Sequence, residues 1–200
     1  MPNSTAILRA EPKVKFSSPI RILYVGTFTP KDGVDFLIGA FDKLLLYRKD
    51  IKLTLIGKGI KRDMDVIGDL IAGNVHIDSK GYVEDDELYD ILVNSDILTM
   101  TRSNSVFANF GFPFKLSEYL ATGNPVVATD VSDVSLYLED KKNACIAIPE
   151  DVDSIYENLK FLTDHQDKAI EIGNSGLDVV KEHFDINKNG EKFVDFLLKL

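Results

Sequence analysis

FPFKLSEYLATGNPVVATD, residues 112–130, predicts a helix, its end and the start of a buried strand within one short stretch. Pro113 suits the first turn of a helix, because its missing N–H would have no partner there and its φ is already helical. Gly123 stands where the helix should end, and the apolar run from Val126 begins a strand. Glu118 then lies mid-helix as a buried-looking acid. A negative ligand group could bind the free N–H groups of the helix start while Glu118 accepts hydrogen bonds from ligand hydroxyls.

Strands and helices alternate on both sides of this stretch. The apolar pattern predicts strands at residues 20–25, 51–56, 75–77, 97–100, 125–129 and 144–148. Besides the helix that carries Glu118, helices are predicted at 33–49, 62–71, 86–93 and 135–138, and three helical stretches extend to Leu200. Such alternation is typical of an α/β fold with a doubly wound, parallel, Rossmann-like sheet.

Ligands of doubly wound sheets bind outside the carboxyl ends of the strands. We therefore expect a binding site in the loops that directly follow the predicted strands. These loops are 26–32, 57–61, 81–85, 101–113 and 130–134. The loop 101–113 is long for a compact domain, and long loops usually serve a function or move.

The composition excludes several classes of function. A chain of 200 residues that is 44% hydrophobic predicts one well-buried domain, and a net charge of −9 argues against a nucleic-acid partner. Cys145 is the one cysteine and is predicted to be a buried strand residue. The three histidines are far apart in sequence and predict neither a metal site nor a catalytic triad. Without a membrane-length apolar run or a signal segment, the expected location is cytoplasmic.

The stretch 112–130 resembles the donor-site signature of the retaining, nucleotide-sugar-dependent glycosyltransferases of group 1, which are family 4-like and have the GT-B fold. That signature reads roughly Glu-Gly-Phe-Gly, a Pro, then Glu-Ala/Tyr-Met/Leu-Ala-x-Gly-x-Pro-Val-Val-Ala. Its second half is matched by Glu118, Ala121, Gly123, Pro125, Val126, Val127 and Ala128. Lys115 matches a subtype that reads Pro-x-Lys-Leu-x-Glu-Tyr. The alternative for Lys115 is a surface ion pair with Glu118 at i, i+3.

Two other loops carry weaker parts of the resemblance. The segment from Gly26 to Ile38 is similar to the family's Val-Gly-Arg-Leu-x-x-x-Lys-Gly-Val-Asp-x-Leu-Ile. Gly81-Tyr82-Val83 is similar to its Gly-Phe/Tyr-Val, where the backbone reads the edge of the nucleobase. An ordinary strand end is the alternative for that segment.

The chain departs from the family at three positions. Phe110 stands eight residues before Glu118, where the family has its first glutamate. Thr27 replaces the arginine that binds the diphosphate, and Asp32 replaces the lysine. Lys31, one position early, is either a substitute or a solvated loop lysine. We hypothesise that Arg102, whose planar guanidinium suits phosphate, partly compensates for both losses.

The resemblance implies a donor site for a nucleotide diphosphate sugar, with no metal and no other cofactor. Glu118 would hold the ribose hydroxyls, and the backbone from Gly111 to Phe114 with nearby cations would hold the diphosphate. The predicted donor-binding residues are Glu118, Lys115, Gly111, Phe112, Phe114, Phe110, Gly26, Thr27, Lys31, Arg102, Tyr82 and Val83. No catalytic residue is assigned in this half.

The resemblance also implies a domain organisation. Residues 1–18 would be the remnant of an interdomain linker, and residues 19–200 the donor-binding domain. An N-terminal acceptor domain would precede Met1, and any peripheral membrane association would go through that missing half. The implied activity is sugar transfer to a glycan or lipid-linked acceptor in surface polysaccharide synthesis, with the isolated domain nearly inactive.

Two rival interpretations remain open. The first is a degenerate, non-catalytic nucleotide-binding or scaffold domain of the same fold, for which Phe110, Thr27 and Asp32 argue. The second is an unrelated Rossmann-type protein such as an epimerase or a dehydrogenase domain. Gly57-Lys58-Gly59 favours it only weakly, because the third glycine of a dinucleotide fingerprint would fall at Arg62.

Overall fold

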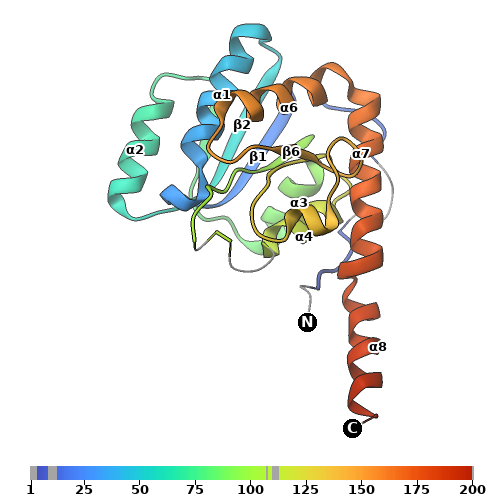
Figure 1. Ribbon diagram of the computed structural model, residues 1–200. Helices are drawn as coiled ribbons and strands as arrows, with labels where there is room; N and C mark the ends of the chain where they lie inside the picture. The colour runs from blue at the N-terminus through green and yellow to red at the C-terminus, as the bar shows by residue number, and fades with distance from the viewer. Residues whose placement is uncertain (1–3, 9–12, 107, 110–112, 200) are drawn as a thin grey trace.

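A single six-stranded sheet organises the protein. The computed structural model describes residues 4–8, 13–106, 108–109 and 113–199. Within these residues all strand pairs are parallel, in the order β3-β2-β1-β4-β5-β6. Helices cover both faces of the sheet (Figure 1). The predicted doubly wound α/β class is therefore confirmed.

The elements follow the predicted alternation closely. The strands are β1 (Ile20–Thr27), β2 (Ile51–Lys58), β3 (Ile77–Lys80), β4 (Ile97–Met100), β5 (Val126–Thr129) and β6 (Cys145–Ala147). The helices are α1 (Val34–Tyr47), α2 (Lys61–Ile71), α3 (Asp85–Asn94), α4 (Phe114–Ala121), α5 (Val134–Tyr137), α6 (Val152–Asp164), α7 (Gln166–Val179) and α8 (Ile186–Leu197). A 3₁₀ turn spans Pro30–Asp32, and one π-helical turn spans Val180–Phe184.

The prediction for the third strand was wrong in position. The apolar run 75–77 lies mostly before β3, and Val75 is 86% exposed. Among the described strands β3 pairs only with β2, so it is an edge strand, and its residues Asp78 and Ser79 are exposed. A strand covered on so little of its surface does not need an apolar sequence.

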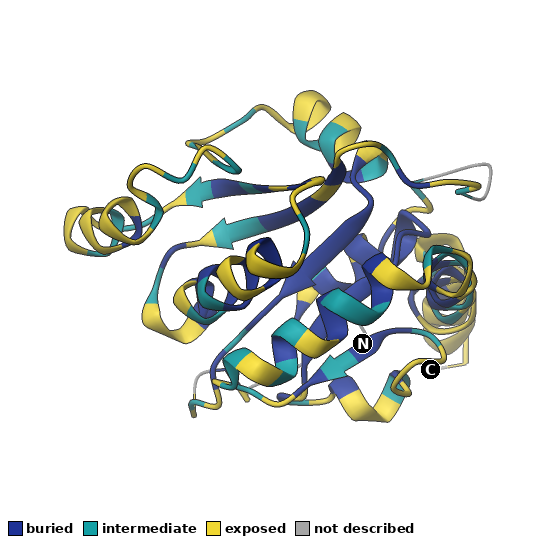
Figure 2. Cartoon of the chain, turned by 90° about the horizontal axis from the view of Figure 1, so that it is seen from above, coloured by how far each residue is buried: buried dark blue, intermediate teal, exposed yellow. Residues whose placement is uncertain are grey.

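Side chains that alternate along each strand build two core layers, one on each face of the sheet. Ile22 and Tyr24 of β1 join the layer under α1 and α6, whereas Leu23 joins the layer that contains Leu116 and Leu120 of α4. Figure 2 shows the central strands as the most buried part of the chain and α2 as largely exposed. Burying each large aliphatic side chain stabilises the fold by about 1.5–3 kcal/mol, so the sheet is a rigid base for its loops.

The order of the strands reverses between β1 and β4. The chain moves outward from β1 to β3 and then crosses back to place β4 on the other side of β1. This switch point is where open α/β sheets bind ligands, because the loops after the two central strands diverge there. The loops after β1 and β4 are thus neighbours.

The N-terminal segment is bonded to the domain at the amino-terminal ends of the central strands β1 and β4, opposite these loops. The buried carboxylate of Asp96 accepts hydrogen bonds from the backbone N–H of Ser17 at 3.1 Å and of Arg21 at 2.8 Å, and it pairs with Lys13 at 2.8 Å. Burial raises the pKa of Asp96, but these partners outweigh it and leave that pKa below its usual value. That residues 1–18 join a second domain stays a prediction.

Helix α8 projects beyond the rest of the domain (Figure 1). Asp185 caps its start, and Asn189 is its one buried residue. Several of its apolar side chains are exposed, namely Ile186, Phe193, Val194, Phe196 and Leu197, as is that of the C-cap residue Leu198. This helix adds little to the core and lies away from the switch point.

Candidate functional site

Three loops are joined at the switch point. The N–H of Ser103 donates to the carbonyl of Lys31 at 2.9 Å, and the hydroxyl of Thr101 donates to the carbonyl of Asp32 at 3.3 Å. Thr129, at the end of β5, donates its hydroxyl to the carbonyl of Arg102 at 2.7 Å. The loops after β1, β4 and β5 therefore hold one another in place.

Gly33 allows close packing at this junction, where the loops after β1 and β4 meet. Its φ is +62°, in the left-handed region that favours glycine. A Cβ at this position would collide with the carbonyl oxygen of Thr101. Only glycine lets the first helix start directly against the loop that follows β4.

Lys115 points into the junction from the first turn of α4. Its ammonium group donates to the carbonyl of Val25 at 3.2 Å and lies 5.0 Å from the ring centroid of Tyr24. A Cβ at Gly26 would overlap that ammonium, so the glycine makes room for it. Burial lowers the pKa of Lys115, and the negative charge of Asp32 opposes this lowering. The result is a cation that is held in place and only half-buried.

Two tyrosine hydroxyls are bonded at the end of β1, and that of Tyr119 fixes the position of α4 against this strand. The Tyr119 hydroxyl donates to the carbonyl of Val25 at 2.9 Å and accepts from its N–H at 3.0 Å. The Tyr24 hydroxyl donates to the carbonyl of Thr27 at 2.8 Å. Burial raises the pKa of both phenols, so they stay neutral donors. These roles of the two tyrosines were not predicted from the sequence, although a tyrosine in an apolar pattern signals a polar tip that needs a partner.

Glu118 is exposed, which corrects the expectation of a buried-looking acid. Its neighbours Ser117 and Tyr119 are buried, so this part of α4 turns its acid outward. Partial burial of the carboxyl still raises the pKa of Glu118, and the charge of Lys115 opposes that rise. The Glu118 carboxylate forms no ion pair or hydrogen bond with the described residues, and the ammonium of Lys115 is bonded to Val25 instead. The surface-pair alternative for Lys115 therefore does not form.

The two family departures in the loop after β1 contact each other. Thr27 donates its hydroxyl to the Asp32 carboxylate at 2.6 Å, and Thr29 donates to the same oxygen. Asp32 is 4% exposed, whereas Thr27 and Lys31 lie at the surface. Where the resemblance implies two cations, the structure has a hydrogen-bonded cluster of Thr27, Thr29 and Asp32.

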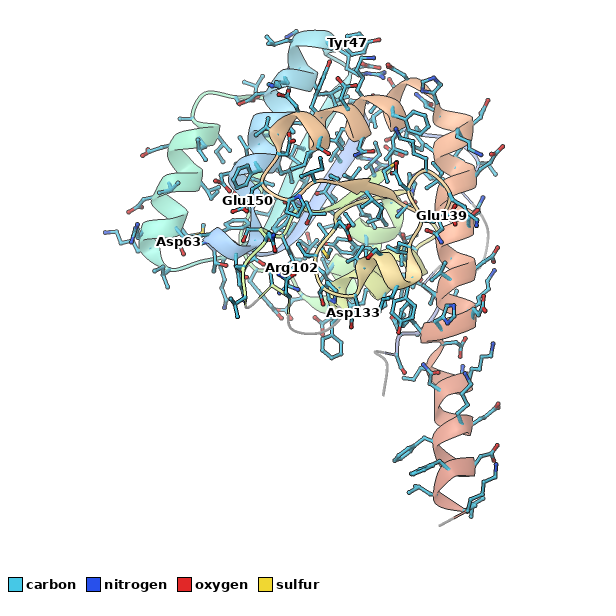
Figure 3. All side chains as sticks on the ribbon, in the orientation of Figure 1. Tyr47, Asp63, Arg102, Asp133, Glu139 and Glu150 are labelled. Carbon is cyan, nitrogen blue, oxygen red and sulfur yellow. The ribbon has the colours of Figure 1, made fainter. Side chains whose placement is uncertain are left out.

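Three cations surround this cluster. Arg102 and Lys31 lie close enough to Lys115 to lower its pKa. Arg102 is half-buried, and its guanidinium makes no hydrogen bond to the described part of the chain. Figure 3 shows Arg102 on the loop side of the sheet, between Asp63 at the start of α2 and Asp133 before α5. That Arg102 compensates for Thr27 and Asp32 stays a prediction.

The start of α4 is open to ligands on its described side. Pro113 precedes the helix, and Phe114 is 72% exposed. Among the described residues, the first N–H of α4 with a backbone acceptor is that of Leu116, which donates to the carbonyl of Pro113 at 3.0 Å. The other predicted site residues of this loop, Phe110, Gly111 and Phe112, lie outside the described residues.

Comparison with known proteins decides the family. The model of the family "Glycosyl transferases group 1" matches residues 19–165, which is more than half of the chain. The chain belongs to this family. An uncharacterized glycosyltransferase of Methanocaldococcus jannaschii is 27% identical over 164 residues, which are 81% of this chain and 40% of that protein. The group 1 domain thus spans well under two thirds of that relative's length.

Solved structures share the fold of this group 1 domain. Anabaena HepE in complex with UDP superimposes with a TM-score of 0.79 at 16% identity, over 90% of this chain and 49% of that one. The C-terminal domain of the group 1 glycosyltransferase LpcC from Francisella tularensis gives a TM-score of 0.75 at 20% identity, over 86% of this chain and 89% of that one. The domain has the fold of a GT-B C-terminal half, as the resemblance implied.

The segment 81–83 lies beyond the end of β3, at the outer side of the glycosyltransferase domain. Tyr82 is 65% exposed, and the ammonium of Lys58 lies 5.8 Å from its ring centroid. Val83 is half-buried against the core layer that contains α4. These residues form an open, partly aromatic surface rather than a closed pocket.

A cavity of 340 Å³ lies near the loop after β1 but does not include Lys115 or Glu118. Phe28, Thr29, Phe36, Arg62 and Ile67 are among its lining residues, so it opens between α1 and α2. The junction with the converging charges lies beside it, where α4 meets β1. We place the candidate site at the junction, because hydrogen bonds there fix a cation and leave a nearby acid free.

The part of the chain that the structure describes contains no cluster of three or more side chains suited to hold a metal ion. In the same residues, no helix is both long and apolar enough to cross a bilayer. Cys145 is buried as predicted, and burial raises the pKa of its thiol to about 12.

Proposed function

We propose that this domain binds a nucleoside diphosphate sugar where α4 meets the loops after β1 and β4. The observation that carries the proposal is the division of roles along α4. Lys115 turns inward and is held at the end of β1, while Glu118, one turn later, turns outward and has no partner among the described residues. Residues at i and i+3 of a helix are neighbours, about 5–6 Å apart at Cβ, so one ligand can reach both.

The proposed ligand pose follows from the charges. The diphosphate lies against Lys115, Arg102 and the start of α4, where an ammonium, a guanidinium and backbone N–H groups can donate to it. The ribose hydroxyls donate to Glu118. The nucleobase then extends over α4 toward Tyr82 and Val83.

The proposed contribution to catalysis is stabilisation of the leaving group. Negative charge grows on the nucleoside diphosphate as the glycosidic bond breaks, and cations already in place favour that transition state. We propose that no metal ion is needed for this step, since Lys115 and Arg102 supply the positive charge. Residues that bind the acceptor would come from another domain, and the chain alone would turn over little donor.

We extend the proposal to the acceptor and location that the sequence resemblance implies. The acceptor would be a glycan or a lipid-linked sugar in surface polysaccharide synthesis, and the location would be cytoplasmic. The support for both is the family membership of the domain and its motif, rather than any residue of the site.

Isothermal titration tests the donor site. UDP, GDP and ADP would be titrated into the chain, with UDP first because the structural relative HepE was solved with it. We expect one nucleotide to bind and the double variant Lys115→Met/Glu118→Ala to lose that binding. Equal binding by the double variant would place the nucleotide elsewhere, and no binding by the wild type would reject the proposal.

A second candidate is a binding domain of the same fold without transferase activity. The cluster of Thr27, Thr29 and Asp32 favours it, because two expected diphosphate-binding cations are absent there. Donor turnover by the full-length protein separates the two candidates. Sugar transfer that is lost in Lys115→Met supports the enzyme, whereas nucleotide binding without any donor cleavage supports the binding domain.

A further inference from the structure

Asp32 is a buried carboxylate with one oxygen unused. Thr27 and Thr29 both donate to Oδ2. Oδ1 receives no hydrogen bond from the described residues, and it is not among their fully enclosed side-chain atoms that lack a partner. Oδ1 therefore faces an opening, although Asp32 as a residue is only 4% exposed, and a ligand at the junction can reach it.

The carboxylate is held at the same junction as Lys115. The backbone carbonyl of Asp32 accepts from Thr101, and the next residue, Gly33, packs against the carbonyl of Thr101. Its partner Thr27 follows Gly26, whose missing side chain leaves room for the Lys115 ammonium. Asp32 therefore cannot swing out to solvent without breaking the loop. A fixed negative charge lies beside the cations proposed to hold the diphosphate.

We propose that Asp32 is a specificity-determining residue that makes this site select the nucleotide sugar over the free nucleoside diphosphate. This inference rests on the proposed donor site. A free nucleoside diphosphate ends in a phosphate with a second ionisation near pH 6, so at pH 7.5 its end carries about one more negative charge than the esterified phosphate of a nucleotide sugar. Asp32 repels that extra charge.

The sugar also supplies a hydrogen-bond donor for Oδ1 of Asp32. A free terminal phosphate that is fully ionised has no hydrogen to donate, whereas a sugar hydroxyl next to the phosphate does. Donor and carboxylate then form a charge-assisted hydrogen bond, which is stronger than one between neutral groups. Both effects favour the substrate over the product, and they hasten release of the nucleoside diphosphate after transfer.

The test compares affinities of matched pairs by titration at pH 7.5 in EDTA, so that no divalent cation neutralises the phosphate. The pairs are UDP with UDP-glucose, GDP with GDP-mannose, and ADP with ADP-glucose. We expect the wild type to bind the sugar form about tenfold more tightly than the free nucleotide. Asp32→Asn keeps the size of the side chain and its acceptor for the threonine hydroxyls. In this variant the free nucleotide should bind about tenfold more tightly, so the preference disappears.

Two controls keep the result interpretable. Asp35→Asn removes a nearby negative charge from the exposed first turn of α1 and should leave the preference unchanged. Should Asp32→Asn fail to fold, the methyl ester of the terminal phosphate of UDP replaces the variant, because it lacks the extra charge and the sugar. The wild type should bind this ester more tightly than UDP.

Each outcome decides between the claims. An unchanged preference in Asp32→Asn, or equal binding of UDP and its methyl ester where UDP is the bound nucleotide, overturns the role of Asp32 and leaves the donor site standing. Absence of binding for every pair, in wild type and variants, overturns the proposed function and this inference together.

Discussion

Helix α4 and the loop after β1 meet at one junction, yet they differ in how far they keep the pattern of their family. α4 has the lysine and the glutamate of the signature, one turned to the sheet and the other to solvent. The loop keeps its glycines but has Thr27 and Asp32 where cations are expected. The comparison shows that the loop keeps the glycines that let it pack closely against its neighbours, although the cations expected from the resemblance are absent.

The largest expected effect is the loss of stability when the junction between the two regions is disrupted. Gly33→Ala introduces a Cβ that collides with the carbonyl of Thr101, at a φ that side chains rarely adopt. We expect the free energy of unfolding to fall by about 3 kcal/mol, from overpacking and left-handed strain together. Urea denaturation followed by circular dichroism measures it.

Gly68→Ala is the matched control for that substitution. Gly68 lies within α2, and a Cβ there meets open space. Alanine should stabilise the helix by about 0.5–1 kcal/mol. Equal stability changes at positions 33 and 68 would show that the loops do not depend on their close approach.

The next largest effect concerns the cation that α4 contributes. Lys115→Met keeps much of the side-chain length and removes the charge-assisted contact, so nucleotide affinity should fall about 100-fold, in line with the loss of a desolvated charged partner. Titration calorimetry gives the ratio. Lys31→Ala, at the exposed position of the loop, should change affinity by no more than about threefold, because solvent screens it. A larger loss at Lys31 than at Lys115 would reverse the assignment of roles.

Replacing Glu118 should lower nucleotide affinity about tenfold, and only through lost contacts with the ribose. Glu118→Ala removes a charged acceptor of hydrogen bonds. A hydrogen bond to a charged group contributes about 1.5–3 kcal/mol, and the expected loss is at the lower end of this range. A nucleotide without ribose hydroxyls should bind the wild type weakly and should not distinguish the wild type from Glu118→Ala. If the variant lost affinity equally for both nucleotides, Glu118 would act on another part of the ligand.

The smallest expected effect is on the pH dependence of nucleotide binding. It tests the electrostatic interaction between Lys115 of α4 and Asp32 of the loop after β1. Burial lowers the pKa of Lys115, and the charge of Asp32 raises it again. The ammonium is the binding form, so affinity should be full at neutral pH and decline as pH rises, earlier than for an ordinary lysine near pH 10.4. In Asp32→Asn the decline should begin at lower pH, because the supporting charge is gone. Nucleotide titrations across alkaline pH measure this decline. Identical pH profiles of the wild type and Asp32→Asn would show that Asp32 does not influence the pKa of Lys115.

The sequence predicted the parts of this molecule that repeat a pattern. Apolar runs bounded by turn residues located five of the six strands, and the motif around Glu118 identified the family. The third strand was misplaced because an edge strand needs little apolar surface, so Val75 attracted the prediction instead of Ile77–Lys80.

Details that depend on side-chain direction were not readable from the sequence. Whether Glu118 faces the core or solvent depends on how α4 rotates against β1, and Tyr119 fixes that rotation through two hydrogen bonds. The contact between Thr27 and Asp32 depends on the 3₁₀ turn Pro30–Asp32, which brings residues five apart together. Neither turn nor rotation leaves a pattern in the residue types alone.

A crystal structure of the chain with its bound nucleotide would show whether α4 and the loop after β1 form the donor site. We expect the terminal phosphate to lie within hydrogen-bonding distance of Lys115 Nζ and the ribose hydroxyls to donate to the Glu118 carboxylate. A nucleotide seated in the 340 Å³ cavity between α1 and α2, with Lys115 still bonded only to Val25, would contradict it.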